Sequence, residues 1–201
     1  KKQTGGSGQF GDVWVRFEPQ EEQDELIFDV EVVGGAVPKN FNPAVEKGIQ
    51  EAILKGPLAG YPMVGLKAVL YDGSYHPVDS NEMAFKLAAI LAYKEAMKTA
   101  MPTLLEPVGA LAVTIPDAYM GDVIGDLNKR RGKIMGMDQA EGKRGYSIVE
   151  AEVPDSEMSD YVHVLRAISQ GRGSYTFYLT GYSEVPGNIA EKIIAEAKKN
   201  A

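Results

Sequence analysis

The sequence predicts an α+β protein made of two domains. The chain has 201 residues, which is enough for two small domains that each bury a core. Segments of alternating apolar and polar residues mix with segments of helical periodicity along its whole length. Pro102 and Pro107 interrupt this pattern near the middle of the chain. We therefore place one domain at residues 1–103 and a second at residues 104–185, followed by a helix at residues 186–201.

Three strands are expected in the first domain. A glycine turn at residues 5–9 opens the chain, and the alternation that follows predicts strands at residues 13–17, 27–33 and 63–71. An acidic stretch between the first two is typical of the loop of a hairpin. Asp72-Gly73 is expected to close the third strand as a turn.

Two helices are expected between and after these strands. The first begins at Asn42, its predicted N-cap, and ends near Gly56. The second begins at Asp79 and Glu82, which have the spacing of a capping box, and ends near residue 100. Apolar residues surround most of the circumference of this second helix, which predicts that it is deeply buried.

The second domain has the element order of a ferredoxin-like fold, strand–helix–strand–strand–helix–strand. The predicted segments are residues 108–115, 116–131, 133–139, 144–153, 156–169 and 174–182. This order predicts an antiparallel sheet with two helices on one face.

Composition excludes several classes of site. There is no cysteine and there are only two histidines, His76 and His163, so no metal site is expected. No apolar run reaches the roughly 18 residues of a membrane span. No P-loop occurs, so this chain is not expected to hydrolyse GTP by itself. The absence of cysteine fits a reducing compartment such as the cytoplasm.

The glycine-rich opening matches the nucleotide loop of protein kinases, and Lys67 lies in a later strand as their phosphate-binding lysine does. A kinase needs a strand before this loop, but only residues 1–4 precede it. The catalytic-loop and magnesium-binding tripeptides of kinases are also missing from the sequence. We interpret residues 5–9 as a structural turn, and we expect no catalytic residue in this chain.

The turn around His76 is the first candidate site. Ser74, Tyr75 and His76 bring a hydroxyl, an aromatic ring and an imidazole together, groups that hydrogen-bond to sugars and stack on bases. An ordinary exposed loop is the alternative. If the turn at residues 5–9 lies at the same end of the sheet, the two loops form one tip.

A basic run at the end of a helix is the second candidate. The net charge is −7, which argues against nucleic-acid binding, but Lys129, Arg130, Arg131 and Lys133 lie together. One or two cations are expected at a helix C-terminus. Four within five residues favour contact with phosphates. Arg172, in a glycine turn after the next helix, is a similar candidate.

Ordered motifs over almost the whole chain resemble elongation factor G, the translocation GTPase of bacterial and organellar ribosomes. The matching segments are Gly8–Gly11, Gly34–Pro38, Pro43–Ile49, Leu58–Pro62, Asp72–His76, Leu104–Pro107, Tyr119–Asn128, Gln170–Ser174 and Glu184–Pro186. The resemblance implies that residues 1–103 are a ribosomal-protein-like βαβ-type domain IV, with the helix at 186–201 packed back on it. It implies that residues 104–185 are the ferredoxin-like domain V.

The resemblance also implies a function without covalent chemistry. The tip, residues Gly5, Gly6, Ser7, Gly8, Gln9, Ser74, Tyr75 and His76, is expected to contact tRNA and mRNA at the decoding site. Domain V is expected to contact rRNA and stalk-base proteins through Lys129, Arg130, Arg131, Lys133 and Arg172. The protein is expected to be a cytoplasmic monomer that promotes translocation, with GTP and magnesium bound in a G domain missing from this sequence.

Two positions depart from the family's usual pattern. Ser7 stands where the family usually has arginine, and Pro77 where it usually has aspartate. The first change removes a positive charge from the tip, and the second stiffens the loop. They keep open the alternative of a divergent paralogue acting in ribosome recycling or protection. Because the sequence begins at Lys1 and not methionine, we expect it to be a piece of a longer chain.

Overall fold

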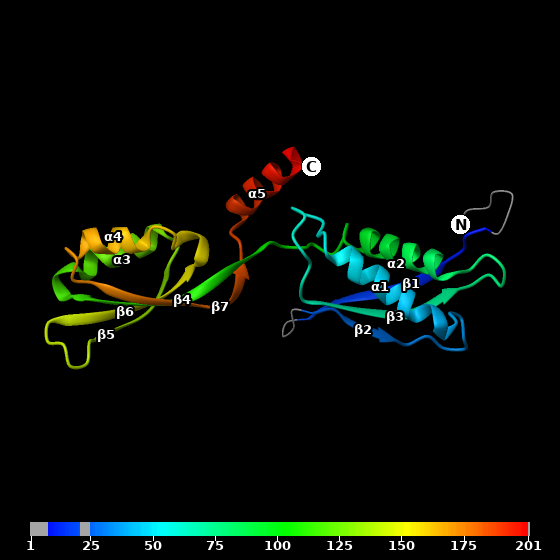
Figure 1. Ribbon diagram of the computed structural model, residues 1–201, viewed down its shortest axis with the longest axis horizontal. Helices are drawn as coiled ribbons and strands as arrows, with labels where there is room; N and C mark the ends of the chain where they lie inside the picture. Colours follow the sequence, from blue (N-terminus) through cyan, green and yellow to red (C-terminus); the bar gives the residue numbers. More distant parts are fainter. Residues whose placement is uncertain (1–7, 21–24, 201) are drawn as a thin grey trace. The chain divides into compact units, whose positions relative to one another are not determined.

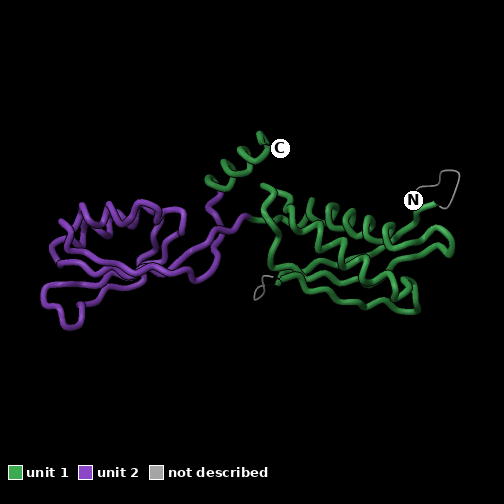
Figure 2. The backbone as a smooth tube through the Cα atoms, in the orientation of Figure 1, with its two compact units in different colours: residues 1–103, 188–201 green, residues 104–187 purple. Residues whose placement is uncertain are grey.

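A computed structural model describes residues 8–20 and 25–200 of the chain (Figure 1). It divides into two compact units (Figure 2). The first unit comprises Lys1–Thr103 and Asn188–Ala201, and the second comprises Leu104–Gly187. Both units combine a sheet with helices, so the predicted α+β class is confirmed.

The first unit contains a three-stranded sheet with the order β1-β3-β2. Its strands are β1 (Asp12–Pro19), β2 (Ile27–Val30) and β3 (Leu66–Ser74). The central β3 pairs antiparallel with β1 and parallel with β2. The predicted hairpin between the first two strands is therefore wrong. β3 lies at the centre and is the most buried of the three, with four buried residues between Leu66 and Leu70, whereas β1 and β2 have none.

The predicted turn at Asp72-Gly73 is also wrong, because both residues belong to β3 and pair with β1. Gly73 serves a different purpose there. A Cβ atom at this position would lie 2.3 Å from the carbonyl oxygen of Asp12 and 2.7 Å from Cγ2 of Val37. The glycine therefore allows close approach of neighbouring chain segments, where sequence reasoning assigned it to a turn.

Two helices, α1 (Asn42–Ile53) and α2 (Glu82–Ala96), cover one face of this sheet (Figure 1). A short 3-10 helix, η1 (Lys39–Phe41), precedes α1. The N-cap residues differ from those predicted. Phe41 is the N-cap of α1, and Asn42 lies inside the helix. Asn81 caps α2, since its side chain accepts a hydrogen bond of 2.8 Å from the backbone N–H of Ala84.

Burial of α2 is confined to one side, so the predicted burial around most of its circumference is wrong. Phe85, Ala89 and Tyr93 are buried against α1 and the sheet. Met83 and Leu91 lie on the other side and are 53% and 66% exposed. A two-layer unit can cover only one face of each helix, whatever the composition of the opposite face.

Gly48 sets the distance between α1 and α2. A Cβ atom at Gly48 would lie 2.5 Å from the carbonyl oxygen of Lys86 and 3.0 Å from Cβ of Ala89. We expect Gly48→Ala to lower the free energy of unfolding of the first unit by about 1–3 kcal/mol, because the backbone of α2 must move away. Urea unfolding followed by the fluorescence of Trp14, the single tryptophan, measures this change.

Gly121, in the second unit, is the matched control for Gly48. Nothing lies within 4 Å of a Cβ atom added there, so Gly121→Ala is expected to stabilise its helix by about 0.5–1 kcal/mol. Gly48→Ala with unchanged stability would show that α1 and α2 are not held at this distance.

The second unit has the predicted ferredoxin-like fold. Its elements are β4 (Leu105–Pro116), η2 (Asp117–Tyr119), α3 (Met120–Lys129), β5 (Lys133–Gln139), β6 (Tyr146–Pro154), η3 (Asp155–Glu157), α4 (Tyr161–Ile168) and β7 (Ser174–Glu184). The antiparallel sheet has the order β5-β6-β4-β7. Side chains of α3 and α4 complete its core, which includes Leu111, Val149 and Leu165.

Both helices of this unit end in the same way. Arg131 follows α3 with φ 59°, and the N–H of Gly132 donates to the carbonyl of Leu127 at 2.8 Å. After α4, Gln170 has φ 53°, and Gly171 donates to Arg166 at 2.8 Å. In each case the left-handed position is taken by a residue other than glycine, and the glycine comes next.

The last helix, α5 (Gly187–Lys199), is amphipathic, with Ile189, Ile193 and Ile194 only partly exposed and no residue fully buried. Its packing on the first domain stays a prediction. Of the helices in the described ranges, none has the length and apolar character needed to cross a bilayer.

Candidate functional site

The described part of the glycine segment and the turn around His76 are joined by hydrogen bonds. The N–H of Gly8 donates to Oδ1 of Asp79 at 2.8 Å, and the N–H of Phe10 donates to the Asp79 carbonyl at 2.9 Å. The hydroxyl of Ser80 donates to the Phe10 carbonyl at 2.9 Å. The two segments therefore form one tip at the same end of the sheet.

Asp79 organises this tip from within. Asp79 as a whole residue is only 7% exposed, which is rare for an aspartate unless its carboxylate has polar partners. Sequence reasoning assigned Asp79 to a capping box and missed this role. Asn81 could have indicated this from the sequence. It directly precedes the helix and can act as the N-cap itself, which leaves the carboxylate of Asp79 free for another partner.

Backbone donors fix the orientation of the His76 imidazole. Its Nδ1 atom accepts hydrogen bonds from the N–H of Val78 at 3.3 Å and of Asp79 at 3.1 Å. In the neutral ring these contacts require the proton on Nε2, because an N–H donates only to an unprotonated nitrogen. Nδ1 also lies 3.5 Å from Oδ2 of Asp79, and the side chain is 46% exposed. The neutral ring therefore presents Nε2–H to solvent at the tip.

The other predicted tip residues differ in what they can contact. Gln9 and Tyr75 are exposed. The hydroxyl of Ser74 donates to Oδ2 of Asp12 at 2.7 Å, so it is already used within the unit. Gly8 is buried by its contact with Asp79. Gly5, Gly6 and Ser7 lie outside the described residues.

Arg130, in the basic run, is buried among acceptors of its own unit. Nε lies 2.8 Å from the Asp126 carboxylate, and Nη1 lies 2.6 Å from that of Asp160 and 2.5 Å from the Glu157 carbonyl oxygen. The guanidinium also lies 5.1 Å from the centre of the Tyr161 ring. The hydrogen bond to Asp160 raises the pKa of Arg130 and lowers that of Asp160.

Arg131 is similarly engaged. Nη1 and Nη2 contact the two oxygens of Glu106 at 2.5 and 3.0 Å, and Nε contacts Glu157 at 3.1 Å. The hydrogen bond to Glu106 raises the pKa of Arg131. Arg131 therefore ties the end of α3 to β4 and η3. Arg130 ties it to η3 and to Asp160, directly before α4. Their predicted rRNA contact stays a prediction, but their charges are already compensated.

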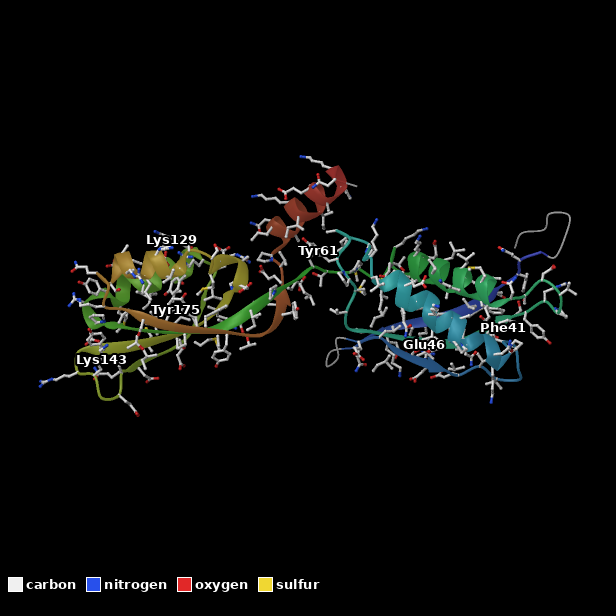
Figure 3. All side chains as sticks on the ribbon, viewed as in Figure 1. Phe41, Glu46, Tyr61, Lys129, Lys143 and Tyr175 are labelled. Carbon is white, nitrogen blue, oxygen red and sulfur yellow. The ribbon has the colours of Figure 1, made fainter. Side chains whose placement is uncertain are left out.

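The remaining basic candidates point to solvent. Lys129 and Lys133 are exposed. Arg172 is exposed too, with its guanidinium 5.1 Å from the centre of the Tyr119 ring and Nη2 hydrogen-bonded to the Tyr119 hydroxyl. Figure 3 shows Lys129 at the helical side of this unit and Lys143 on the loop between β5 and β6. Within the described ranges, no three His, Asp or Glu side chains are placed to hold a metal ion.

Two family models together match almost the whole chain. The model described as "Elongation factor G, domain IV" matches residues 1–101, and the model described as "Elongation factor G C-terminus" matches residues 103–193. The chain belongs to the elongation factor G family. The two matched regions meet between residues 101 and 103, beside the boundary of the compact units.

A solved structure has a similar fold over the whole of this chain. The crystal structure of ttk003000868 from Thermus thermophilus is similar to this chain, with 46% sequence identity and a TM-score of 0.85. The similarity covers 100% of this chain and 29% of that one. This elongation factor G chain therefore spans less than a third of the length of that relative.

Proposed function

We propose that this chain is the ribosome-binding C-terminal portion of an elongation factor G-type GTPase, and that its tip enters the decoding site during translocation of tRNA and mRNA. One observation carries the proposal: the hydrogen bonds of Asp79 hold the glycine segment and the His76 turn as a single tip. Among the described tip residues, Gln9, Ser74, Tyr75 and His76 are exposed, and the hydroxyl of Ser74 already donates to Asp12.

The tip suits contact with paired nucleic acid strands. Tyr75 offers an aromatic surface, and His76 offers an oriented Nε2–H that can donate to a sugar or phosphate oxygen. Neither side chain needs to react, since the work of the tip is to occupy a site so that the RNA does not slip back. GTP and magnesium are then bound in another part of a longer cytoplasmic protein.

The second unit serves as the contact with the large subunit in this proposal. Lys129, Lys133 and Arg172 are its exposed cations among the predicted rRNA-contact residues. Arg130 and Arg131 shape the end of α3 beside Lys129 and Lys133, whereas Arg172 follows α4. Proteins of the ribosomal stalk base are the proposed protein partners here, and the protein acts as a monomer.

A chimera tests this function. The corresponding segment of a translocation-active elongation factor G is replaced by this chain, and movement of mRNA is measured by toeprinting. We expect translocation, and we expect His76→Ala to slow it about tenfold, since losing one hydrogen bond of roughly 1.4 kcal/mol corresponds to that factor. Glu46→Gln, on α1 and away from the tip, is the control with unchanged rate (Figure 3).

Recycling or ribosome protection is the alternative function, favoured by Pro77 and Ser7 at positions where the family usually has charged residues. A chimera that binds ribosomes, leaves mRNA in place and separates the subunits or displaces a bound inhibitor would support it. The same outcome would overturn the translocation proposal.

A further inference from the structure

The sheet of the first unit has an open face with two exposed aromatic side chains. Helices α1 and α2 cover the opposite face. Trp14 on β1 is 54% exposed and Tyr71 on β3 is 39% exposed. Their rings meet edge to face, with centroids 6.2 Å apart and an interplanar angle of 84°. Exposed neighbouring aromatic rings of this size are typical of an interaction surface.

Strand geometry explains why both rings face outward. Val13, Val15 and Phe17 pack in the core, so the alternating residue Trp14 must point to the open face. A bulge then places Tyr71 beside it, because Trp14 pairs with Asp72 while Val15 pairs with Leu70. Bulges commonly redirect a side chain in this way.

Charge on this face is predominantly negative. The two cations that the described strands place on this face are already paired. Arg16 contacts Glu18 at 2.5 Å and Glu31 at 3.3 Å, and Lys67 contacts Asp29 at 2.9 Å. These pairs involve three carboxylates, so they contribute no net positive charge to the face.

Asp12 and Asp72 lie next to the aromatic pair. Among the described residues, the hydrogen bonds to their carboxylates come from neutral donors, the Ser74 hydroxyl and the Gly73 N–H. Their negative charges are therefore not compensated by an ion pair in the described part of the chain. Two aromatic rings beside two such carboxylates can bind the cationic side chain of an arginine or a lysine, through the ring faces and through opposite charge.

We propose that Trp14, Tyr71, Asp12 and Asp72 form a docking site for a Lys/Arg-rich segment of a protein partner. Cations bind the faces of aromatic rings, and the site already shows such a contact, since the Arg16 guanidinium lies 6.0 Å from the centre of the Tyr71 ring. RNA is a poorer occupant because Asp12 and Asp72 repel phosphates. This site lies on the sheet face and borders the tip, since Asp12 accepts a hydrogen bond from Ser74, but it does not use His76.

Trp14 is the single tryptophan of the chain, so its fluorescence reports directly on this site. A short peptide of alternating arginine and glycine is added to the 201-residue chain at low salt. We expect a saturable fluorescence change that weakens as ionic strength rises. A glutamate–glycine peptide of the same length and a short uridine RNA are expected to produce no change.

Isosteric variants separate charge from structure. Asp12→Asn and Asp72→Asn keep the oxygen that accepts each hydrogen bond and remove only the charge. Each is expected to weaken peptide binding about threefold, and the double variant about tenfold. Glu46→Gln, which removes one negative charge from α1, is expected to bind like the unaltered chain.

Three results would overturn the proposal. The first is that the double variant binds the arginine–glycine peptide as tightly as the unaltered chain does. The second is that the unaltered chain binds the uridine RNA as tightly as the peptide, and the third is that the peptide leaves the Trp14 fluorescence unchanged. Thermal unfolding followed by circular dichroism confirms that each variant is folded. The readout involves no ribosome, so its failure is distinct from a failure of the translocation assay.

Discussion

Replacing Arg130 with alanine is expected to lower the free energy of unfolding of the second unit by about 2–4 kcal/mol. The substitution removes the partner of two carboxylates, Asp126 and Asp160, and of the Glu157 carbonyl. The carboxylate of Asp126 is only 19% exposed, so it regains little water when the guanidinium is lost. The ring of Tyr161 also loses the cation beside it.

Two optical signals separate the units in this experiment. Trp14 reports on the first unit, whereas far-ultraviolet circular dichroism reports on both. In urea, Arg130→Ala is expected to shift the circular dichroism transition and leave the Trp14 transition unchanged. Lys129→Ala, one residue earlier and exposed, is the control with almost no effect. Equal stability of the two variants would mean that Arg130 is not held by these contacts.

Acid should remove part of the difference between Arg130→Ala and the unaltered chain. Arg130 lowers the pKa of Asp160 below its ordinary value of 3.8 in the folded unit. The folded state therefore binds this proton less readily than the unfolded state does. Stability from the pair is present above the ordinary pKa and is lost as the pH falls through the lower folded value. Urea unfolding at several pH values checks this convergence.

Local sequence signals predicted the second unit well but gave no indication of the acceptors that contact Arg130. Each of its strands and helices was predicted in the right order, because strand and helix periodicities there alternate without overlap. The partners of Arg130 could not be predicted from local sequence, since Asp160 lies 30 residues away. Only the tertiary packing of α3 beside α4 brings these charges together, so the run could be interpreted as an RNA-binding patch.

Non-local pairing also explains the errors in the first unit. A hairpin between β1 and β2 is the shortest connection, but the buried strand β3 lies between them and pairs with both. The tip shows the same limit. That the segment at Gly8 and the turn at His76 lie together was a conditional prediction from the sequence, whereas the hydrogen bond of Asp79 that joins them spans 71 residues.

Asp79→Ala is expected to free Gly8 from the tip, while the backbone bond from Phe10 to Asp79 and the Ser80 bond to Phe10 remain. The substitution leaves the buried N–H of Gly8 without its acceptor, at a cost of about 1–3 kcal/mol. Amide hydrogen exchange at Gly8 should accelerate by roughly tenfold or more, since 1.4 kcal/mol corresponds to a factor of ten. In the chimera, translocation should slow by a similar factor, because Gln9 is then held beside the His76 turn only on its Phe10 side.

Two further variants decide whether Asp79 acts as a tip clamp or as a helix cap. Asp79→Asn keeps an oxygen at Oδ1 and should leave Gly8 exchange almost unchanged. Asn81→Ala removes the acceptor of the Ala84 N–H, so it should accelerate exchange at Ala84 while Gly8 stays protected. Faster exchange at Glu82 in Asp79→Ala, with Gly8 unaffected, would restore the capping box and contradict the clamp, because an N-cap at Asp79 accepts from the N–H of Glu82. The separation of these two amides therefore tests the geometry on which the proposed tip depends.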